Sequence, residues 1–402
     1  MNPSRPLLHL RDPIYPPPGG WPVLRLGFRP FYLLAAAYAL LAVPFWVFIY
    51  AGFPYLNPKE PMLAWHAHEM IFGFVLAVIS GFLLTAVKNW TGLQTPRGGL
   101  LGFLAILWLL ARLGPWLMPL PMWAVIDVGF DLLMTCLLGR IIIKARSRRN
   151  YFVPVLLLML ALANTLFYAS LMHCIKLNWL HPVLAALALI IFLETMIAGR
   201  VIPMFTRNAI KGVEQYRLEW LERLLPVLTL LSLSCWILFP RGAMTAIMAV
   251  FAGVLHAVRW WGWNPLSSWK KPMLWILHVS YGWLIFGFFL IAAAITGWGS
   301  QLMIIHVWSV GATAGLIIGM ITRTAQGHTG RFLCADREEI VAYAAIMIAA
   351  LLRVLPLLVP VLQAHYLFWL ITSASCWFTG FLVYEIRYFP WLMSTRVDGQ
   401  DG

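Results

Sequence analysis

The sequence predicts an all-α polytopic membrane protein with about twelve transmembrane helices and both termini in the cytoplasm. Of its 402 residues, 61% are hydrophobic and only 11% are charged, whereas soluble chains carry about 25% charged residues. Stretches of about 20 apolar residues, long enough to cross a bilayer, recur along the whole chain. Lysine and arginine gather in every second connection between these stretches, as they do at a cytoplasmic face. Composition, apolar length and charge alternation therefore indicate the same class of protein.

Twelve apolar stretches follow one another along the chain, separated by proline, glycine and charged residues. They cover residues 31–51, 65–87, 98–117, 121–143, 151–174, 180–200, 220–239, 242–260, 272–296, 300–322, 338–361 and 364–388. The third is the least regular, because Arg112 and Pro115 interrupt it. The predicted organisation is a cytosolic tail over 1–30, one transmembrane domain over 31–388 and a second cytosolic tail over 389–402.

The basic residues set the predicted orientation. The connections that follow even-numbered stretches hold Lys88, Arg97, Lys144, Arg146, Arg148, Arg149, Arg207, Lys211, Arg217, Arg223, Arg259, Lys270, Lys271, Arg323, Arg331 and Arg337. The opposite connections hold few beyond Lys59, Lys176 and Arg241. This alternation explains the net charge of +14, so membrane lipid is an expected partner and nucleic acid is not.

Histidines stand out against this apolar background. His66 and His68 open the second stretch, and His306 lies about six residues into the tenth, so all three belong to the outer leaflet. A bilayer disfavours ionisable side chains, whereas neutral imidazoles bind metal ions and haem iron. We therefore predict a haem site at this depth. Residues two apart on a helix point about 200° apart, so His66 and His68 are not expected to bind one ion together.

A second layer of histidines lies toward the predicted inner face. His256 and His278 end and begin neighbouring stretches joined by a short basic connection, and His328 follows the tenth stretch. These three are the predicted ligands of an inner metal site, either copper or a second haem. Arg323 and Arg331 flank His328. They are candidates for holding haem propionates, and the alternative is ordinary cytoplasmic charge.

Three acidic residues stand out inside the apolar stretches. Asp127 and Asp131 are four residues apart on one helical face, where they are candidate partners for Arg112 or Arg140. Glu194 lies in the sixth stretch. It is either part of a proton path, as buried carboxylates often are, or a structural partner of Arg200.

Four segments give the chain a family resemblance. They are residues 65–74 (WHAHEMIFGF), 81–92 (GFLLTAVKNWTG), 199–208 (GRVIPMFTRN) and 323–331 (RTAQGHTGR). In this order they resemble the NnrS family, with Lys88 as a mild departure where a proline is expected. The resemblance implies a protein of the bacterial inner membrane that contains haem, expected to be b-type, and copper. It also implies an association with denitrification and with resistance to nitric oxide and nitrosative stress.

Three functions are compatible with these features. The first is a haem-binding protein that protects the cell from nitric oxide by binding it or by redox chemistry at a histidine-ligated metal. The second is a transporter or metal-delivery protein for a metal, haem or a nitrosylated complex. The third is a reductase of the heme-copper type, which requires an electron donor; the chain has no adjacent His-His pair of the kind found at such copper sites.

Overall fold

The computed structural model describes residues 20–53, 58 and 61–400, and its long elements are all α-helical. Residues 1–19 of the predicted N-terminal tail and residues 401–402 of the C-terminal tail lie outside the described residues. The long helices are α1 (Phe28–Tyr50), α2 (Met62–His68) with η3 (Glu69–Val75) and α3 (Leu76–Thr91), α4 (Gly99–Leu117), α5 (Leu120–Lys144), α6 (Phe152–Leu171), α7 (Leu180–Ala209), α8 (Glu219–Leu238), α9 (Ala243–Gly262), α10 (Pro272–Ile295), α11 (Gln301–His306) with η6 (Val307–Ala314) and α12 (Gly315–His328), α13 (Arg337–Leu358) and α14 (Tyr366–Met393). Short 3₁₀ turns are η1 (Pro22–Leu24), η4 (Arg148–Asn150), η5 (Pro265–Ser268) and η7 (Pro360–His365).

Eleven helices of the described chain are long and apolar enough to cross a membrane. The remaining long helix, α5, has 25 residues and buries two aspartates, Asp127 and Asp131. The predicted all-α polytopic class is therefore confirmed. The cytoplasmic position of both termini stays a prediction.

The helix boundaries lie close to the predicted ones, with one clear exception. Helix α7 was expected to end at residue 200, before Pro203, but it continues to Ala209. A proline removes one backbone donor, and a transmembrane helix tolerates that loss where neighbouring helices pack around it. Proline was therefore a poor marker of the end of this helix.

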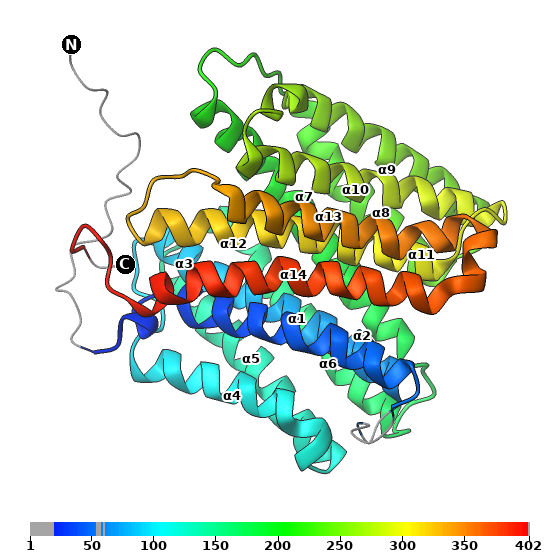
Figure 1. The fold of residues 1–402 in the computed structure, drawn as a ribbon, viewed down its shortest axis with the longest axis horizontal. Helices are drawn as coiled ribbons and strands as arrows, with labels where there is room; N and C mark the ends of the chain where they lie inside the picture. The colour runs from blue at the N-terminus through cyan, green and yellow to red at the C-terminus, as the bar shows by residue number, and fades with distance from the viewer. Residues whose placement is uncertain (1–19, 54–57, 59–60, 401–402) are drawn as a thin grey trace.

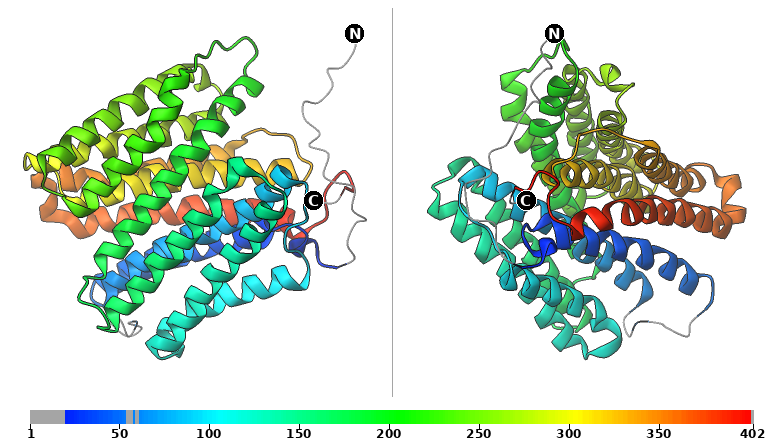
Figure 2. Two further views of the ribbon diagram at one scale, coloured as in Figure 1. Left: turned by 180° about the vertical axis from the view of Figure 1, so that it is seen from behind. Right: turned by 60° about the vertical axis from the view of Figure 1, so that its left-hand side comes forward.

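The helices form one bundle with all long axes running in roughly the same direction (Figure 1). Helices α4 to α6 lie on one side, α8 to α10 lie on the other, and α1, α12, α13 and α14 run between them. The first and last helices, α1 and α14, pack side by side, and Trp377 Nε1 donates to the carbonyl of Ala39 across that contact at 2.8 Å (Figure 2).

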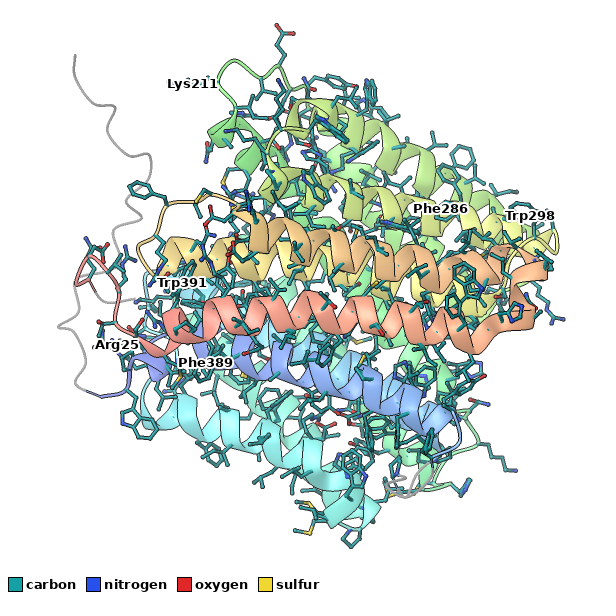
Figure 3. The ribbon with its side chains drawn as sticks, in the orientation of Figure 1. Arg25, Lys211, Phe286, Trp298, Phe389 and Trp391 are labelled. Carbon is teal, nitrogen blue, oxygen red and sulfur yellow. The ribbon has the colours of Figure 1, made fainter. Side chains whose placement is uncertain are left out.

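The two ends of the bundle differ in charge. Arg25 and Lys211 mark one end, which we call the basic end, and Trp298 marks the opposite, far end (Figure 3). Helices α2 and α11 begin at the far end, and α3 and α12 finish at the basic end (Figure 1). The histidines in the last turns of α2 and α11 thus lie in the far-end half of the bundle, and His328 lies at the basic end.

Candidate functional site

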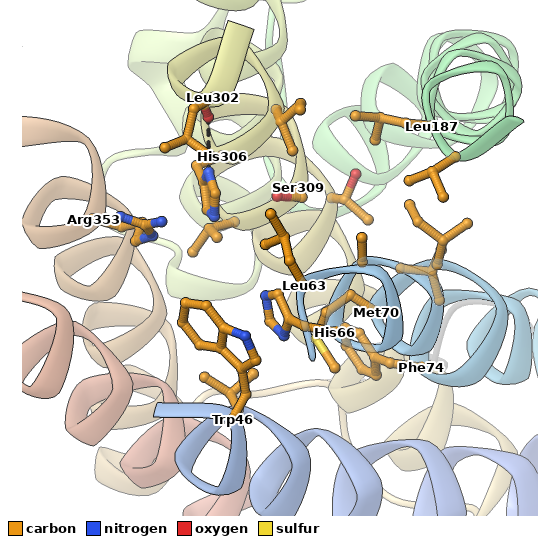
Figure 4. A pocket seen from close by; sticks show the side chains of 18 of the residues that line it. Trp46, Leu63, His66, Met70, Phe74, Leu187, Leu302, His306, Ser309 and Arg353 are labelled. Atoms are coloured by element: carbon orange, nitrogen blue, oxygen red, sulfur yellow. Dashed lines mark hydrogen bonds between the residues drawn. The ribbon is translucent and has the colours of Figure 1, made fainter. Parts of the chain in front are cut away.

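A cavity of about 390 Å³ opens in the far-end half of the bundle. Helices α1, α2, α7, α11, α13 and α14, together with η3 and η6, contribute side chains to its wall. His66 and His306 enter it from different helices, and Figure 4 shows their imidazoles facing the same space. We call this space the two-histidine cavity. Of the two candidates on the second stretch, His66 and His68, it is therefore His66 that shares this cavity with His306.

The helices that carry these histidines share an unusual backbone feature. Directly after His68, residues Glu69–Val75 form the π-helix η3, and directly after His306, residues Val307–Ala314 form the π-helix η6. Wide π turns are rare and occur often at functional sites. Along the cavity wall, Met70 and Phe74 follow His66, and Ser309 and Thr313 follow His306.

His306 is held with one ring nitrogen free. Its Nδ1 lies 2.8 Å from the carbonyl oxygen of Leu302, one turn earlier. A carbonyl can only accept, so Nδ1 carries the proton and Nε2 keeps its lone pair for the cavity. A backbone carbonyl bound to the second nitrogen is the usual way in which a metal-binding histidine is oriented and made more basic. Ser300 begins α11 by capping it, accepting from the backbone N–H of Met303 at 3.2 Å.

His66 is held by stacking. Its ring lies 4.3 Å from the ring of Trp46, centroid to centroid, with 22° between the planes. Its Nδ1 is buried and has no hydrogen-bond partner among the described residues. A buried ring nitrogen without a partner is costly unless a ligand completes it.

Arg353 supplies the positive charge of the cavity. This side chain of α13 is buried, lines the cavity and donates to the hydroxyl of Tyr366 at 2.6 Å. No carboxylate among the described residues pairs with it. A buried guanidinium that lacks an acidic partner is suited to an anionic group on a ligand.

These features fit a haem. Two imidazoles offer ring nitrogens, Arg353 offers a partner for a propionate, and Trp46, Phe74 and Trp377 are among the mainly apolar side chains of the wall. The volume lies within the range of about 300–1,000 Å³ that is usual for small-molecule sites. The residues present therefore fit the group that the sequence led us to expect.

The predicted inner site is not assembled. The described residues contain no group of three metal-binding side chains that includes His256, His278 or His328. Helices α9 and α10 are adjacent, as predicted. However, His256 bonds to Thr229 at 2.9 Å and to Tyr281 at 2.7 Å, so both of its nitrogens are in use.

His278 and His328 take separate positions. His278 Nε2 lies 3.0 Å from the hydroxyl of Thr206 on α7, and its Nδ1 has no partner among the described residues. His328 packs against Phe28 with ring centroids 5.5 Å apart. Their positions along the apolar stretches predicted a similar depth in the membrane for the three histidines, but their rings contact different neighbours. The structure does not bring these three histidines together, and a three-histidine copper or haem site stays a prediction.

Arg323 and Arg331 do not serve the two-histidine cavity. Arg323 lies within the last two turns of α12 and Arg331 follows that helix, so both are at the basic end. Arg323 stacks on Phe205 at 3.8 Å, and Arg331 stacks on Trp391 at 4.3 Å. The residue that sequence reasoning missed is Arg353. An arginine inside the apolar stretch 338–361 was the signal that could have identified it.

His68 belongs to a different environment, which we call the His68 network. Its members are Tyr38, His68, Glu69, Arg112, Asp127, Asp131, Asn164 and Tyr168. His68 Nδ1 lies 3.0 Å from Glu69 Oε1, and its Nε2 lies 3.0 Å from Asn164 Oδ1. Both ring nitrogens face oxygen acceptors, so neither offers a lone pair to a metal. The prediction that His66 and His68 serve different sites agrees with this geometry.

Arg112 holds the acidic side of the network together. Its Nη1 donates to Glu69 at 2.8 Å, and its Nη2 pairs with Asp127. Asn164 donates to Asp127 at 3.0 Å and to Asp131 at 2.8 Å. Of the two candidate partners that the sequence offered for Asp127, Arg112 and Arg140, the ion pair forms with Arg112. The buried charges that interrupted the third and fourth stretches therefore satisfy one another inside the bundle.

One family model matches the chain. It is the model described as NnrS protein, and it matches residues 22–396, which is nearly the whole chain. No curated protein matches the chain.

Proposed function

The chain belongs to the NnrS family, and on that premise we propose that it is a haem-binding membrane protein that protects the cell against nitric oxide and nitrosative stress. The observation that carries the proposal is the pair of imidazoles, His66 and His306, facing one cavity beside the buried Arg353. The expected setting is the bacterial inner membrane. An electron donor is needed only where nitric oxide is turned over and not merely bound.

The two histidines take different parts in this proposal. His306 would be the stronger ligand, because its Nδ1–H is bonded to the Leu302 carbonyl and its Nε2 is oriented. His66 would be the more easily displaced ligand, because only stacking on Trp46 holds its ring. Arg353 would bind a propionate. Haem, when bound, supplies an iron that takes up nitric oxide, and this small apolar gas reaches a bilayer-embedded site through lipid.

Copper, as an alternative occupant of this cavity, has a specific observation in its favour. Met70 and His66, four residues apart, line the same cavity as His306. Thioether sulfur and imidazole nitrogen are ligands that Cu(I) accepts. The proposed place for copper is thus this cavity, and not the histidines near the basic end.

The test is an optical spectrum of the purified protein, oxidised and reduced, before and after addition of nitric oxide. We expect a Soret band with sharp bands in the reduced state, and a shift of these bands with nitric oxide. His306→Ala should remove the bands and His66→Ala should weaken or shift them. His181→Ala, an exposed histidine outside the cavity, is the matched control.

Three outcomes would count against the proposal. A protein that stays colourless after haem reconstitution would favour the transporter or metal-delivery function. Haem bands that nitric oxide does not move would indicate an electron carrier. A His306→Ala variant that folds normally and keeps an unchanged spectrum would remove the two-histidine cavity as the haem site.

A further inference from the structure

A row of polar side chains leads out of the two-histidine cavity. Along the wide helix η6, Ser309 and Thr313 follow His306 on the face that lines this cavity. Beyond Thr313 lies Glu194 of α7, whose carboxyl group comes near the Thr313 hydroxyl without forming a regular hydrogen bond to it. The row therefore ends at a carboxyl group near the middle of a membrane-spanning helix.

This carboxyl group is short of partners. Glu194 Oε2 and Thr313 Oγ1 are both buried, and neither forms a well-aligned hydrogen bond within the described part of the chain. Arg200, the structural partner that the sequence suggested, instead donates to Asn150 at 3.4 Å and stacks on Phe152 at 5.5 Å. A buried carboxyl group without a cation is unexplained by packing alone.

Glu194 also faces a second cavity, of about 100 Å³, which we call the middle cavity. Its other lining residues are apolar except for Tyr32 of α1, which is the second titratable group there. The middle cavity shares Val75 and Ile190 with the two-histidine cavity. A space of this size has room for several water molecules, and Glu194 and Tyr32 offer them polar partners.

A third cavity continues the series to the basic end. It has a volume of about 500 Å³ and shares Phe82, Ile197, Val201 and Met320 with the middle cavity. Its polar lining includes Arg149, Arg200 and His328. Helix α7 lines all three spaces in turn, with Ile190, Glu194 and Arg200 marking the progression. The three cavities therefore form a series from the basic end to the histidines.

We propose that Glu194 is a proton-binding site that passes protons from the basic end of the bundle to the two-histidine cavity. A proton that enters from the basic end, carried as hydronium by water in the middle cavity, forms an O–H bond at the Glu194 carboxylate and leaves a neutral water molecule behind. That bond then breaks as the proton moves to the Thr313 hydroxyl, which releases its own proton toward Ser309. The carboxylate is restored and no electron moves. The delivery of protons to the two-histidine cavity rests on the proposed function, since a reaction that reduces nitric oxide consumes protons.

The first experiment needs no haem. Infrared difference spectra between the wild type and Glu194→Gln identify the carboxyl stretch of Glu194, and transfer into D₂O then tests its exchange. We expect a band that shifts promptly in D₂O. Val201→Phe, which narrows the passage between the middle and third cavities, should slow the shift by roughly tenfold or more. Glu385→Gln, which removes a half-buried carboxyl group outside these cavities, is the matched control.

The second experiment uses haem-loaded protein in vesicles, with a dye that reports proton uptake after flash reduction. Glu194→Gln should slow the uptake by about 100-fold, in the range usual for loss of a proton-transferring group. Glu194→Asp should retain most of the rate, because the carboxyl group is preserved. Glu385→Gln should behave as the wild type.

The outcomes separate this inference from the proposed function. If Glu194→Gln takes up protons at the wild-type rate, or if the Glu194 band does not exchange in D₂O, the proton route is wrong even when haem and nitric oxide bind. If the protein proves colourless, the haem proposal fails, but prompt exchange that Val201→Phe slows still supports Glu194 as a proton-binding site.

Discussion

His66 and His68 stand two residues apart on one helix, yet they occupy opposite kinds of environment. His68 has an oxygen acceptor at each ring nitrogen and lies in a buried network of charges. His66 has a buried nitrogen without a partner among the described residues and faces a mainly apolar cavity. The comparison teaches that an intramembrane histidine becomes a candidate ligand only when the protein leaves one of its nitrogens free.

The largest expected effect comes from breaking the His68 network at Arg112. Arg112→Met leaves Glu69 and Asp127 buried without the guanidinium that bridges them. Removing one partner of a buried ion pair costs about 3–5 kcal/mol. We expect this loss in the free energy of unfolding, measured by denaturant titration in detergent micelles. Arg323→Met is the matched control, since Arg323 stacks on Phe205 and pairs with no carboxylate among the described residues. Equal losses in both variants would contradict the network.

The two histidines can then be compared directly. His68→Ala removes hydrogen bonds to Glu69 and Asn164, so it should lower the free energy of unfolding by about 2–3 kcal/mol. His66→Ala loses a stacking contact with Trp46 and should cost about 1 kcal/mol. The haem spectrum should respond in the reverse order, changing in His66→Ala and remaining in the folded fraction of His68→Ala. A spectrum lost only in His68→Ala would reverse the assignment.

A smaller effect is expected at the charged edge of the cavity. Arg353→Met should weaken haem binding by roughly tenfold or more, because a charge-assisted hydrogen bond to a propionate is lost. Haem titration of the apoprotein, followed at the Soret band, measures this change. Arg331→Met, at the basic end and stacked on Trp391, should bind haem as the wild type does. If Arg331→Met weakened haem binding and Arg353→Met did not, the result would support the basic-end arginines as the partners of the haem propionates.

The sequence predicts the fold well for a physical reason. Apolar stretches must be long enough to cross a bilayer, so composition alone locates most of them to within a few residues, and the end of α7 is the exception. Arg112 and Asp127 are charges within apolar stretches; Arg112 was one of two candidate partners for Asp127, and the two residues do pair. The four-residue spacing of Asp127 and Asp131 placed both on one helical face.

The site was less predictable, because depth along a helix does not fix the direction of a side chain. His256 and His278 come from adjacent helices, yet they bond to Thr229 on α8 and Thr206 on α7 respectively. The π-helices that follow His68 and His306 change the helical register, and apolar periodicity does not distinguish such a wide turn from an ordinary helical turn. Arg353 alone carried a usable signal, as an arginine within an apolar stretch.

The smallest expected effect tests whether the wide turn η6 shapes the cavity. A Cβ at Gly311 would lie 2.6 Å from the ring of Trp283, which is closer than carbon atoms normally approach. Trp283 is half-buried and can yield, so Gly311→Ala should cost about 1 kcal/mol in the free energy of unfolding. It should also shift the haem spectrum, since Ser309 and Thr313 flank Gly311 on the cavity wall. Gly282→Ala, where a Cβ meets open space, is the control and should leave the spectrum unchanged. An unshifted spectrum in Gly311→Ala would mean that η6 tolerates repacking without moving its cavity residues, and the importance of the π turn would then rest on η3 alone.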